Sequence, residues 1–229
     1  MLFTNQAPFG KIVIETVKEA IMNDKIIITI ARQYGSGGRE VGEKVAAKLG
    51  IPLYDKLLIT EAASRGKLDE NVSKLADESS ANSLLYTLAM GSNMLGTTMH
   101  FGYKMPLNDK LFILQSEIIK EHAKENSGVF IGRCADYVLR DEENLFRIFI
   151  YGDLDHREAR VKERHPELKP SQVIDVINKT DKRRSSYYNF YTGNKWGKYD
   201  NYDIAINSST LGIDGTADLI CSCVKNLMK

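Results

Sequence analysis

The sequence predicts an α/β fold in which a five-stranded parallel sheet carries helices on both faces. Three observations lead to this prediction. An apolar, β-branched run at residues 26–30 is typical of a central strand buried on both faces. Strand-like segments then alternate with amphipathic helical ones, which is the pattern of a parallel sheet covered by helices. Three glycines within four residues directly follow the first strand and permit a tight turn into a helix.

The individual elements follow from hydrophobic spacing and from capping residues. The spacing of Ile14, Val17 and Ile21 predicts an amphipathic helix over about residues 10–22. A helix over 40–49 ends at Gly50 and leads to a second strand at 51–54, which implies a right-handed crossover. Residues 91–106, rich in Gly, Ser, Thr, Met and Asn, are predicted to form a loop. The other predicted strands are 129–131, 145–151 and 203–207, and the other predicted helices are 57–64, 72–78, one beginning at about 108, 155–164, 171–188 and 214–227.

Composition limits the class of protein. The chain has 229 residues, 43% hydrophobic and 27% charged, as expected for one globular domain. A net charge of +1 gives no general basic surface for nucleic acid or for an anionic membrane, so neither is expected as a partner. The longest apolar run is far too short to span a bilayer, and no signal peptide is recognisable. Three cysteines and four scattered histidines predict no metal site, and reduced thiols suggest a cytoplasmic protein.

The glycine-rich turn after the first strand is the strongest candidate binding site. Gly35, Gly37 and Gly38 allow positive φ angles and let backbone N–H groups approach a ligand, and Ser36 lies among them. The start of the following helix adds unpaired N–H groups and a positive dipole end, which favour an anion. The sequence therefore predicts a phosphate site here. The alternative is a glycine turn that serves only tight packing.

This loop departs from the strict P-loop, which reads Gly, four residues, Gly-Lys and then Ser or Thr. Counted from the strand, the lysine position falls on Gly38 and the hydroxyl position on Glu40. Arg32 or Arg39 would then supply the positive charge, and Glu40 would offer a magnesium ligand. Arginine has a different reach and a forked geometry, so the replacement is not like for like.

Three sequence blocks together resemble the cytidylate kinase-like family, which is related to bacterial cytidylate kinase but has a degenerate phosphate loop. The blocks are ITIARQYGSGGREVGEKVAAKLGIPLYDKLLI, VFIGRCADYVLRDEENLFRIFI and DKRRSSYYNFYTGNKWGKYDNYDIAINSS, and the match covers about residues 25–227. The resemblance implies a single nucleoside monophosphate kinase domain over 1–229, with a three-layer αβα core, a helical monophosphate-binding insertion at about 57–108 and a lid at about 153–200. It also implies transfer of the γ-phosphate of ATP, with Mg²⁺ bound transiently, to a nucleotide substrate such as CMP.

The same resemblance assigns roles to single residues. Residues 35–39 would cradle the donor phosphates, and Asp55 would lie near the monophosphate. Arg133, in Gly-Arg-Cys, would contact the acceptor, and Cys134 replaces the aspartate of that motif. The remaining residues are charged groups of the lid and of the Asp-x-Arg region: Arg157, Arg160, Arg164, Asp181, Arg183 and Arg184. Of the whole set, Arg39, Arg160, Arg183 and Arg184 are the candidate catalytic residues, and Asp181 and Arg184 would also bind substrate. The alternative for the lid arginines is a solvated charged face.

Residues 187–202 form a dense aromatic segment. Its aromatic rings could stack a base or hold a lid shut. They could equally pack inside the chain or form a homodimer patch. Three functions therefore stay open at this point. The first is an ATP-dependent kinase, the second a non-catalytic nucleotide- or anion-binding module, and the third a homo-oligomeric interaction protein.

Overall fold

The computed structural model describes residues 25–66 and 107–228 of the chain. The predicted helices at 10–22 and 72–78 and the predicted loop at 91–106 lie outside the described residues. Within the described residues, no helix is both long and apolar enough to cross a membrane.

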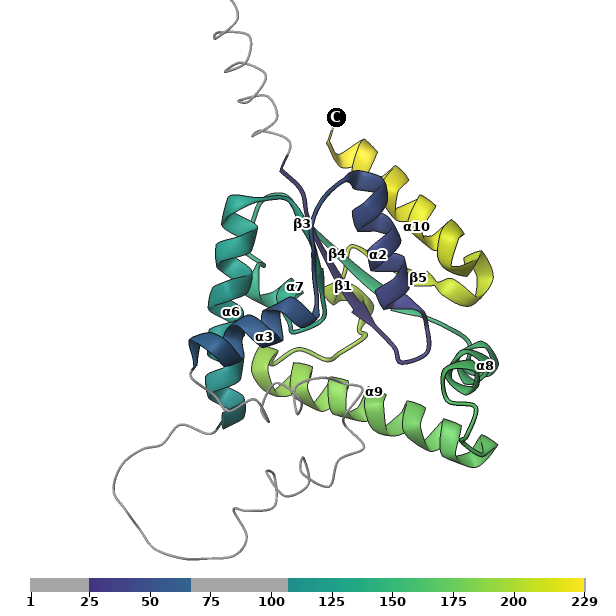
Figure 1. Ribbon diagram of the computed structural model, residues 1–229. Coiled ribbons are helices and arrows are strands. Elements are labelled where there is room, and N and C mark those ends of the chain that lie inside the picture. The colour runs from purple at the N-terminus through teal and green to yellow at the C-terminus, as the bar shows by residue number, and fades with distance from the viewer. Residues whose placement is uncertain (1–24, 67–106, 229) are drawn as a thin grey trace, which may run out of the picture.

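The centre of the molecule is a five-stranded parallel sheet with the order β2-β3-β1-β4-β5 (Figure 1). The strands are β1 (Ile27–Arg32), β2 (Leu53–Tyr54), β3 (Gly128–Ile131), β4 (Leu145–Tyr151) and β5 (Ile204–Asn207). The predicted fold class is therefore confirmed, and the second strand is shorter than predicted. From β1 the chain crosses to β2 on one side, whereas from β4 it continues to β5 on the other. The carboxyl ends of β1 and β4 thus form the switch point at which such sheets bind ligands.

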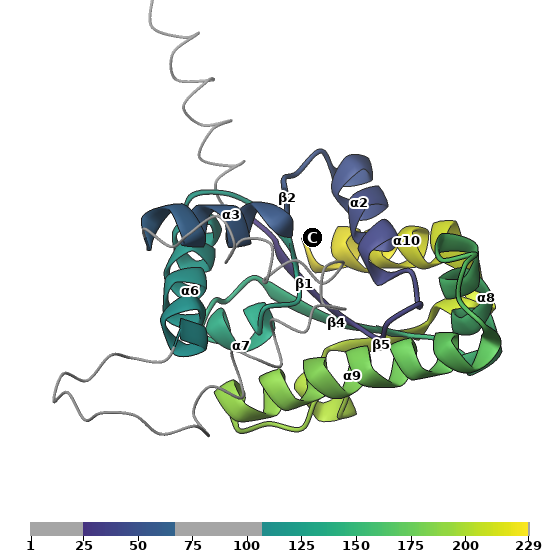
Figure 2. The ribbon, with the colours of Figure 1, turned by 60° about the horizontal axis from the view of Figure 1, so that its bottom comes forward.

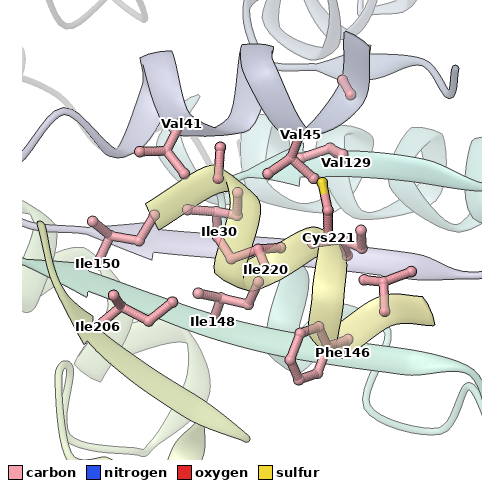
Figure 3. Packing of buried hydrophobic residues seen from close by; sticks show 14 of the residues in the cluster. Ile30, Val41, Val45, Val129, Phe146, Ile148, Ile150, Ile206, Ile220 and Cys221 are labelled. Atoms are coloured by element: carbon pink, nitrogen blue, oxygen red, sulfur yellow. The ribbon is translucent and has the colours of Figure 1, made fainter. Parts of the chain in front are cut away.

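One face of the sheet is covered by α2 (Gly38–Leu49) and α10 (Ser208–Leu227). Buried aliphatic side chains from these helices, including Val41, Val45 and Ile220, pack on alternate residues of β1 and β4 (Figure 3). At the surface, Lys44 and Lys48 of α2 form ion pairs with Asp214 and Asp218 of α10, at 2.6 and 2.5 Å. This layer fixes α2, and therefore the loop before it, against the sheet.

The opposite face is covered by α3 (Lys56–Arg65), α6 (Leu107–Glu125) and the short α7 (Ala135–Val138). Their buried side chains, such as Leu58, Ile118 and Leu139, pack against Ile27 and Phe130 of the sheet. Together with the α2 and α10 layer this completes the predicted three-layer arrangement. Helix α7 was not predicted, because four residues are too few to show helical periodicity.

Two further helices, α8 (Leu154–Arg164) and α9 (Pro170–Thr192), lie side by side near the carboxyl ends of the strands (Figure 1, Figure 2). They share a small apolar core of Val161, Val173 and Ile177, against which Tyr34 of the glycine turn packs. A single 3₁₀ turn, η3 (Tyr199–Asn201), precedes β5. Helix α10 begins six residues before the predicted position at 214. Gly212 interrupts it with non-helical angles (φ 65, ψ 177), so the prediction located only the second part.

Candidate phosphate-binding site

The glycine loop runs from the end of β1 to the start of α2, and its geometry requires glycine at two positions. Gly35 and Gly37 have φ angles of 82° and 77°. A Cβ on Gly35 would lie 2.8 Å from the carbonyl oxygen of Arg157, and one on Gly37 would lie 2.2 Å from Cδ1 of Ile213. Both the left-handed backbone and the lack of space therefore exclude a side chain. Gly37 is the residue that caps the N-terminus of α2.

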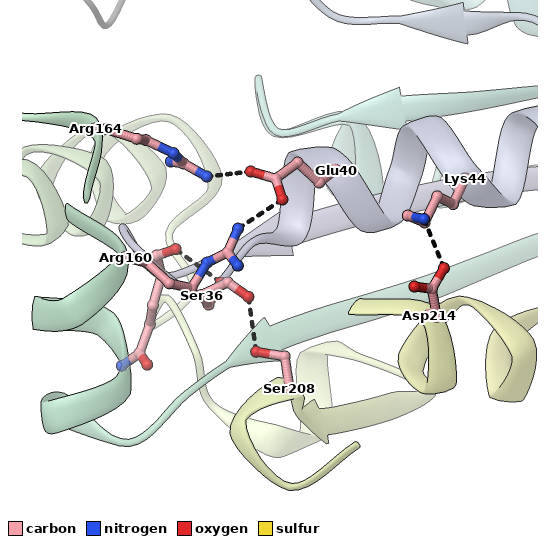
Figure 4. A network of polar contacts seen from close by, with 8 residues as sticks. Ser36, Glu40, Lys44, Arg160, Arg164, Ser208 and Asp214 are labelled. Carbon is pink, nitrogen blue, oxygen red and sulfur yellow. Dashed lines mark hydrogen bonds and ion pairs between the residues drawn. The ribbon is translucent and has the colours of Figure 1, made fainter. Parts of the chain in front are cut away.

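The backbone of the loop is held from the sheet side by buried hydroxyl groups. Ser36 donates its hydroxyl to the carbonyl oxygens of Gln33 at 2.9 Å and Ile150 at 3.2 Å. Ser208 donates to the carbonyl oxygen of Ser36 at 2.7 Å (Figure 4). Ser36 was predicted to bind the donor nucleotide. Its hydroxyl supports the loop from within. That residues 35–39 hold donor phosphates stays a prediction.

Three N–H groups of the loop have partners within the described residues, those of Gln33, Tyr34 and Ser36. The N–H groups of Gly35 and Gly37 have none there, and the first turn of an α-helix leaves further N–H groups without intrahelical partners. These donors and the dipole of α2 make the loop a site for an anion.

Helix α8 brings two cations to the loop. Nη2 of Arg160 lies 3.3 Å from the Cβ position of Gly37 and 2.6 Å from a carboxylate oxygen of Glu40. Arg164 contacts the other oxygen of Glu40 (Figure 4). Partial burial acts to raise the pKa of Glu40, but the two guanidinium groups hold that pKa below its ordinary value of 4.5. Arg160 thus lies beside the glycine loop, and the alternative of a merely solvated face does not hold for it. Arg164 contacts Glu40 at the start of α2.

Helix α9 braces the loop from its other side. Asp181 accepts the N–H of Tyr34 at 2.7 Å through one oxygen and pairs with Arg157 at 2.6 Å through the other. One turn later, Arg184 donates to the carbonyl oxygen of Arg32 at 2.8 Å and lies over the ring of Tyr34. Asp181 and Arg184, which were predicted to bind substrate, therefore hold the loop itself.

Family comparison agrees with this architecture. The family model described as the cytidylate kinase-like family matches residues 27–210. The chain belongs to the cytidylate kinase-like family. No curated protein sequence matches the chain.

Among solved structures, an uncharacterized protein from Eubacterium ventriosum ATCC 27560 is 30% identical, with a TM-score of 0.65. The alignment covers 88% of this chain and 99% of that one. A shikimate kinase from Bacteroides thetaiotaomicron is 12% identical with a TM-score of 0.49, over 87% of this chain and 98% of that one. Another, from Acinetobacter baumannii in complex with shikimate, is 10% identical with a TM-score of 0.48, over 90% and 97% of the two chains.

Arg39, which was predicted to supply positive charge at the glycine loop, has other partners in this cytidylate kinase-like protein. Its guanidinium pairs with Asp55 at 3.0 Å and with Glu43 at 3.2 Å, and it is half exposed. The structure thus brings Arg39 and Asp55 together at the end of β2, and not over the glycine loop. When the last glycine of the strict P-loop is aligned with Gly37, its Ser or Thr position falls on Arg39. The prediction that this position falls on Glu40 is therefore corrected by one residue.

The predicted acceptor residue, Arg133, lies in an unusual turn at the end of β3. Gly132, Arg133 and Cys134 all have positive φ, of 67°, 57° and 57°. Non-glycine residues seldom adopt this conformation, and such strain is concentrated at functional sites. Cys134 is buried, and burial raises the pKa of its thiol far above the ordinary value of 9.0. It is therefore a packing residue and not a reactive thiol. This backbone conformation could not be predicted from the sequence, because only one of the three residues is glycine.

Behind this turn lies a buried polar pair that the sequence did not reveal. Asp136 of α7 accepts a 2.7 Å hydrogen bond from the hydroxyl of Tyr188 in α9. Burial raises the pKa of Asp136, although the bond from Tyr188 acts to lower it. The pair joins α7, which follows Arg133, to α9, which carries Asp181 and Arg184. The position of Asp136 within Gly-Arg-Cys-Ala-Asp was visible in the sequence, but its long-range partner was not.

The aromatic segment is mostly used for packing within the chain. Tyr191 stacks on Phe112 of α6, and Trp196 and Tyr202 pack against Phe149 of β4. Phe190 and Tyr199 are exposed. The packing alternative thus holds for most of the segment, whereas its use in a homodimer stays a prediction.

The donor groups of the site suit an anion such as phosphate better than a resident metal. The loop N–H groups, Arg160 and Arg164 are all donors to anions. Within the described ranges, no group of three or more His, Cys, Asp or Glu side chains could hold a metal ion. Mg²⁺ commonly binds through one or two carboxylates, substrate phosphates and water. Glu40, which was predicted to offer a magnesium ligand, pairs with Arg160 and Arg164. The binding of Mg²⁺ together with a nucleotide stays a prediction.

Proposed function

We propose that the protein is an ATP-dependent phosphotransferase that acts on a nucleoside monophosphate of the CMP type or on a related small acceptor. The observation that carries this proposal is the position of Arg160 beside the glycine loop, with Nη2 3.3 Å from the point that a Cβ on Gly37 would occupy. Phosphoryl transfer is catalysed by positioning and by positive charge around the moving group. A cation from α8 beside a buried, donor-rich loop supplies both.

In the proposed reaction an oxygen of the acceptor attacks the γ-phosphorus of ATP. The bond from that phosphorus to the β–γ bridging oxygen breaks, and ADP leaves with the electron pair. A monophosphate acceptor brings an oxygen that is already ionised, so the chain needs no general base. Mg²⁺, when bound, would neutralise charge on the β- and γ-oxygens. The arginines contribute forked donors that match phosphate oxygens.

Membership of a kinase-like family and the place of Arg133 at the end of β3 support an acceptor site beside the loop. The acceptor would lie between this turn and the Arg39–Asp55 pair, at the carboxyl ends of β3 and β2. Both ends are adjacent in the sheet. Arg133 would hold the acceptor phosphate.

A second candidate, a non-catalytic nucleotide- or anion-binding module, rests on two specific observations. Gly38 occupies the position of the P-loop lysine, and the carboxylate of Glu40 engages both Arg160 and Arg164. Such a module would bind ATP without turning it over.

One experiment separates the two candidates. Purified protein is incubated with ATP, Mg²⁺ and a panel of nucleoside monophosphates, and ADP and diphosphates are quantified. We expect equal formation of both products with at least one acceptor. Arg160→Ala should reduce the rate by about a hundredfold, in the range found for loss of one transition-state donor. Arg140→Ala is the matched control, because Arg140 is exposed and bonds to Tyr137, on α7. ATP binding without product would favour the module, and neither binding nor product would contradict both.

A further inference from the structure

The side chain of Arg32 lies in a slot between two glycines. A Cβ on Gly38 would lie 2.5 Å from Cβ and 3.0 Å from Cγ of Arg32. A Cβ on Gly132 would lie 2.1 Å from Nη1 and 3.2 Å from Cζ of the same side chain. The arginine therefore passes the first residue of α2 and ends at the turn after β3. A side chain at either glycine would displace it.

The strict P-loop fills this slot in the opposite way. Aligned on Gly37, its first glycine falls on Arg32 and its lysine falls on Gly38. This chain has the cation at the first position and glycine at the second. Because Cβ atoms at 32 and 38 would be only 2.5 Å apart, the two positions cannot both carry a side chain in this backbone. One arrangement excludes the other.

We propose that Arg32 replaces the missing P-loop lysine, so that the catalytic cation of the loop has moved from residue 38 to residue 32. This inference rests on the proposed function. A lysine at 38 would reach the β- and γ-phosphates. The side chain of Arg32 passes Gly38 at the start of α2, and its guanidinium ends beside Gly132, in the turn that carries Arg133. It thus lies between the donor loop and the acceptor turn, where the transferred group passes.

The backbone around Arg32 fixes this placement. Its carbonyl oxygen accepts the hydrogen bond from Arg184, and the strand to which it belongs is paired with β3 and β4 on both sides. These contacts fix the backbone of Arg32, and the space left by Gly38 and Gly132 accommodates its side chain along the course described above. Pre-organised charge of this kind stabilises a transition state without rearrangement during the reaction.

The test uses three variants that remove the positive charge at residue 32, add one at residue 38, or do both. Arg32→Gly should lower phosphoryl transfer by at least about a hundredfold and weaken the binding of ATP or of inorganic tripolyphosphate. Gly38→Lys alone should lower the melting temperature, because its Cβ would collide with Arg32. The double variant Arg32→Gly/Gly38→Lys restores the strict pattern. It should recover the melting temperature lost in Gly38→Lys, and it should transfer phosphate at least tenfold faster than Arg32→Gly.

Each result decides something. An active wild type whose rate is unchanged in Arg32→Gly would overturn the inference and leave the proposed function standing. The inference would also fall if the double variant is folded and no faster than Arg32→Gly. A wild type that neither binds polyphosphate nor transfers it would overturn the proposed function, and with it the role of Arg32. In that case the melting temperatures would still show whether positions 32 and 38 exclude each other.

Discussion

The carboxylate of Asp181 joins the glycine loop to helix α8, because it accepts the N–H of Tyr34 at 2.7 Å and pairs with the guanidinium of Arg157 at 2.6 Å. Both charged side chains are largely buried, with exposures of 17% and 7%. Removing one partner of such a pair leaves an uncompensated charge.

We therefore expect Asp181→Ala to lower the free energy of unfolding by about 3 kcal/mol, measured by urea denaturation. Asp181→Asn should cost less, since an amide oxygen can still accept the Tyr34 N–H. Hydrogen exchange of the Tyr34 amide should accelerate in the alanine variant and much less in the asparagine variant. Asp175→Ala, an exposed site on the same helix, should change neither quantity. Equal exchange rates in all three variants would show that Asp181 does not hold the loop.

The Asp136–Tyr188 pair predicts a dependence of stability on pH. Burial raises the pKa of Asp136 above its ordinary value of 3.8, so the folded protein binds a proton that the unfolded chain releases. Stability should consequently fall as the pH rises from about that ordinary value through the folded pKa. Tyr188→Phe removes a hydrogen bond that lowers the pKa of Asp136. It should cost about 2 kcal/mol at pH values where Asp136 is ionised and less at pH values where Asp136 is protonated.

Urea denaturation of the wild type and of Tyr188→Phe across this pH range measures the difference. Asp136→Asn is the companion variant, because it has no carboxyl group to titrate at this site. Its stability should vary less with pH than that of the wild type. A loss in Tyr188→Phe that is the same at every pH would contradict this account of the pair.

Glu40 is expected to compete with an anionic ligand for Arg160 and Arg164 of α8. Its carboxylate contacts both Arg160 and Arg164, so a bound phosphate must share or displace those contacts. We expect Glu40→Gln to tighten the binding of Mg²⁺-free ATP by about threefold, more at low ionic strength, because an exposed ion pair contributes little and is screened by salt. Calorimetric titration at two salt concentrations checks this. Weaker binding would mean that Glu40 positions the arginines for the phosphate instead.

Arg39 is expected to contribute little to phosphoryl transfer. Because its guanidinium pairs with Asp55 and Glu43 and is half exposed, Arg39→Ala should keep phosphoryl transfer within about tenfold of the wild-type rate. Arg160→Ala, assayed in parallel, should lose far more. A loss of several orders of magnitude in Arg39→Ala would restore Arg39 as the cation that replaces the lysine.

The fold could be predicted well because its signals are local. The apolar run of β1, the glycines before α2 and the alternation of strands and helices all depend on near neighbours in the sequence. The site could be predicted only in part. That Arg160 reaches Gly37, 123 positions earlier in the numbering, depends on how α8 packs on α9 and the loop. The spacing of residues along the sequence does not predict such a long-range approach.

The contacts of Arg39, Arg32 and Asp181 could not be predicted for the same reason, because they depend on how separate segments of the chain pack together. Arg39 and Arg32 were equally good candidates from sequence, since both flank the glycines. The tertiary structure separates them, because Arg39 turns toward Asp55 while Arg32 passes between Gly38 and Gly132. Asp181 was predicted to bind substrate from its motif alone. Its carboxylate is used by Tyr34 and Arg157, which lie on two other segments of the chain.

Phosphoryl transfer by this protein can be tested directly by ³¹P NMR of a single reaction that contains the protein, ATP, Mg²⁺ and CMP, repeated with other monophosphates. The proposed function predicts that the γ-phosphate resonance of ATP declines while the resonances of ADP and of a new nucleoside diphosphate rise in equal amounts. A folded protein that leaves the ATP spectrum unchanged with every acceptor, or that yields ADP and inorganic phosphate only, would contradict it.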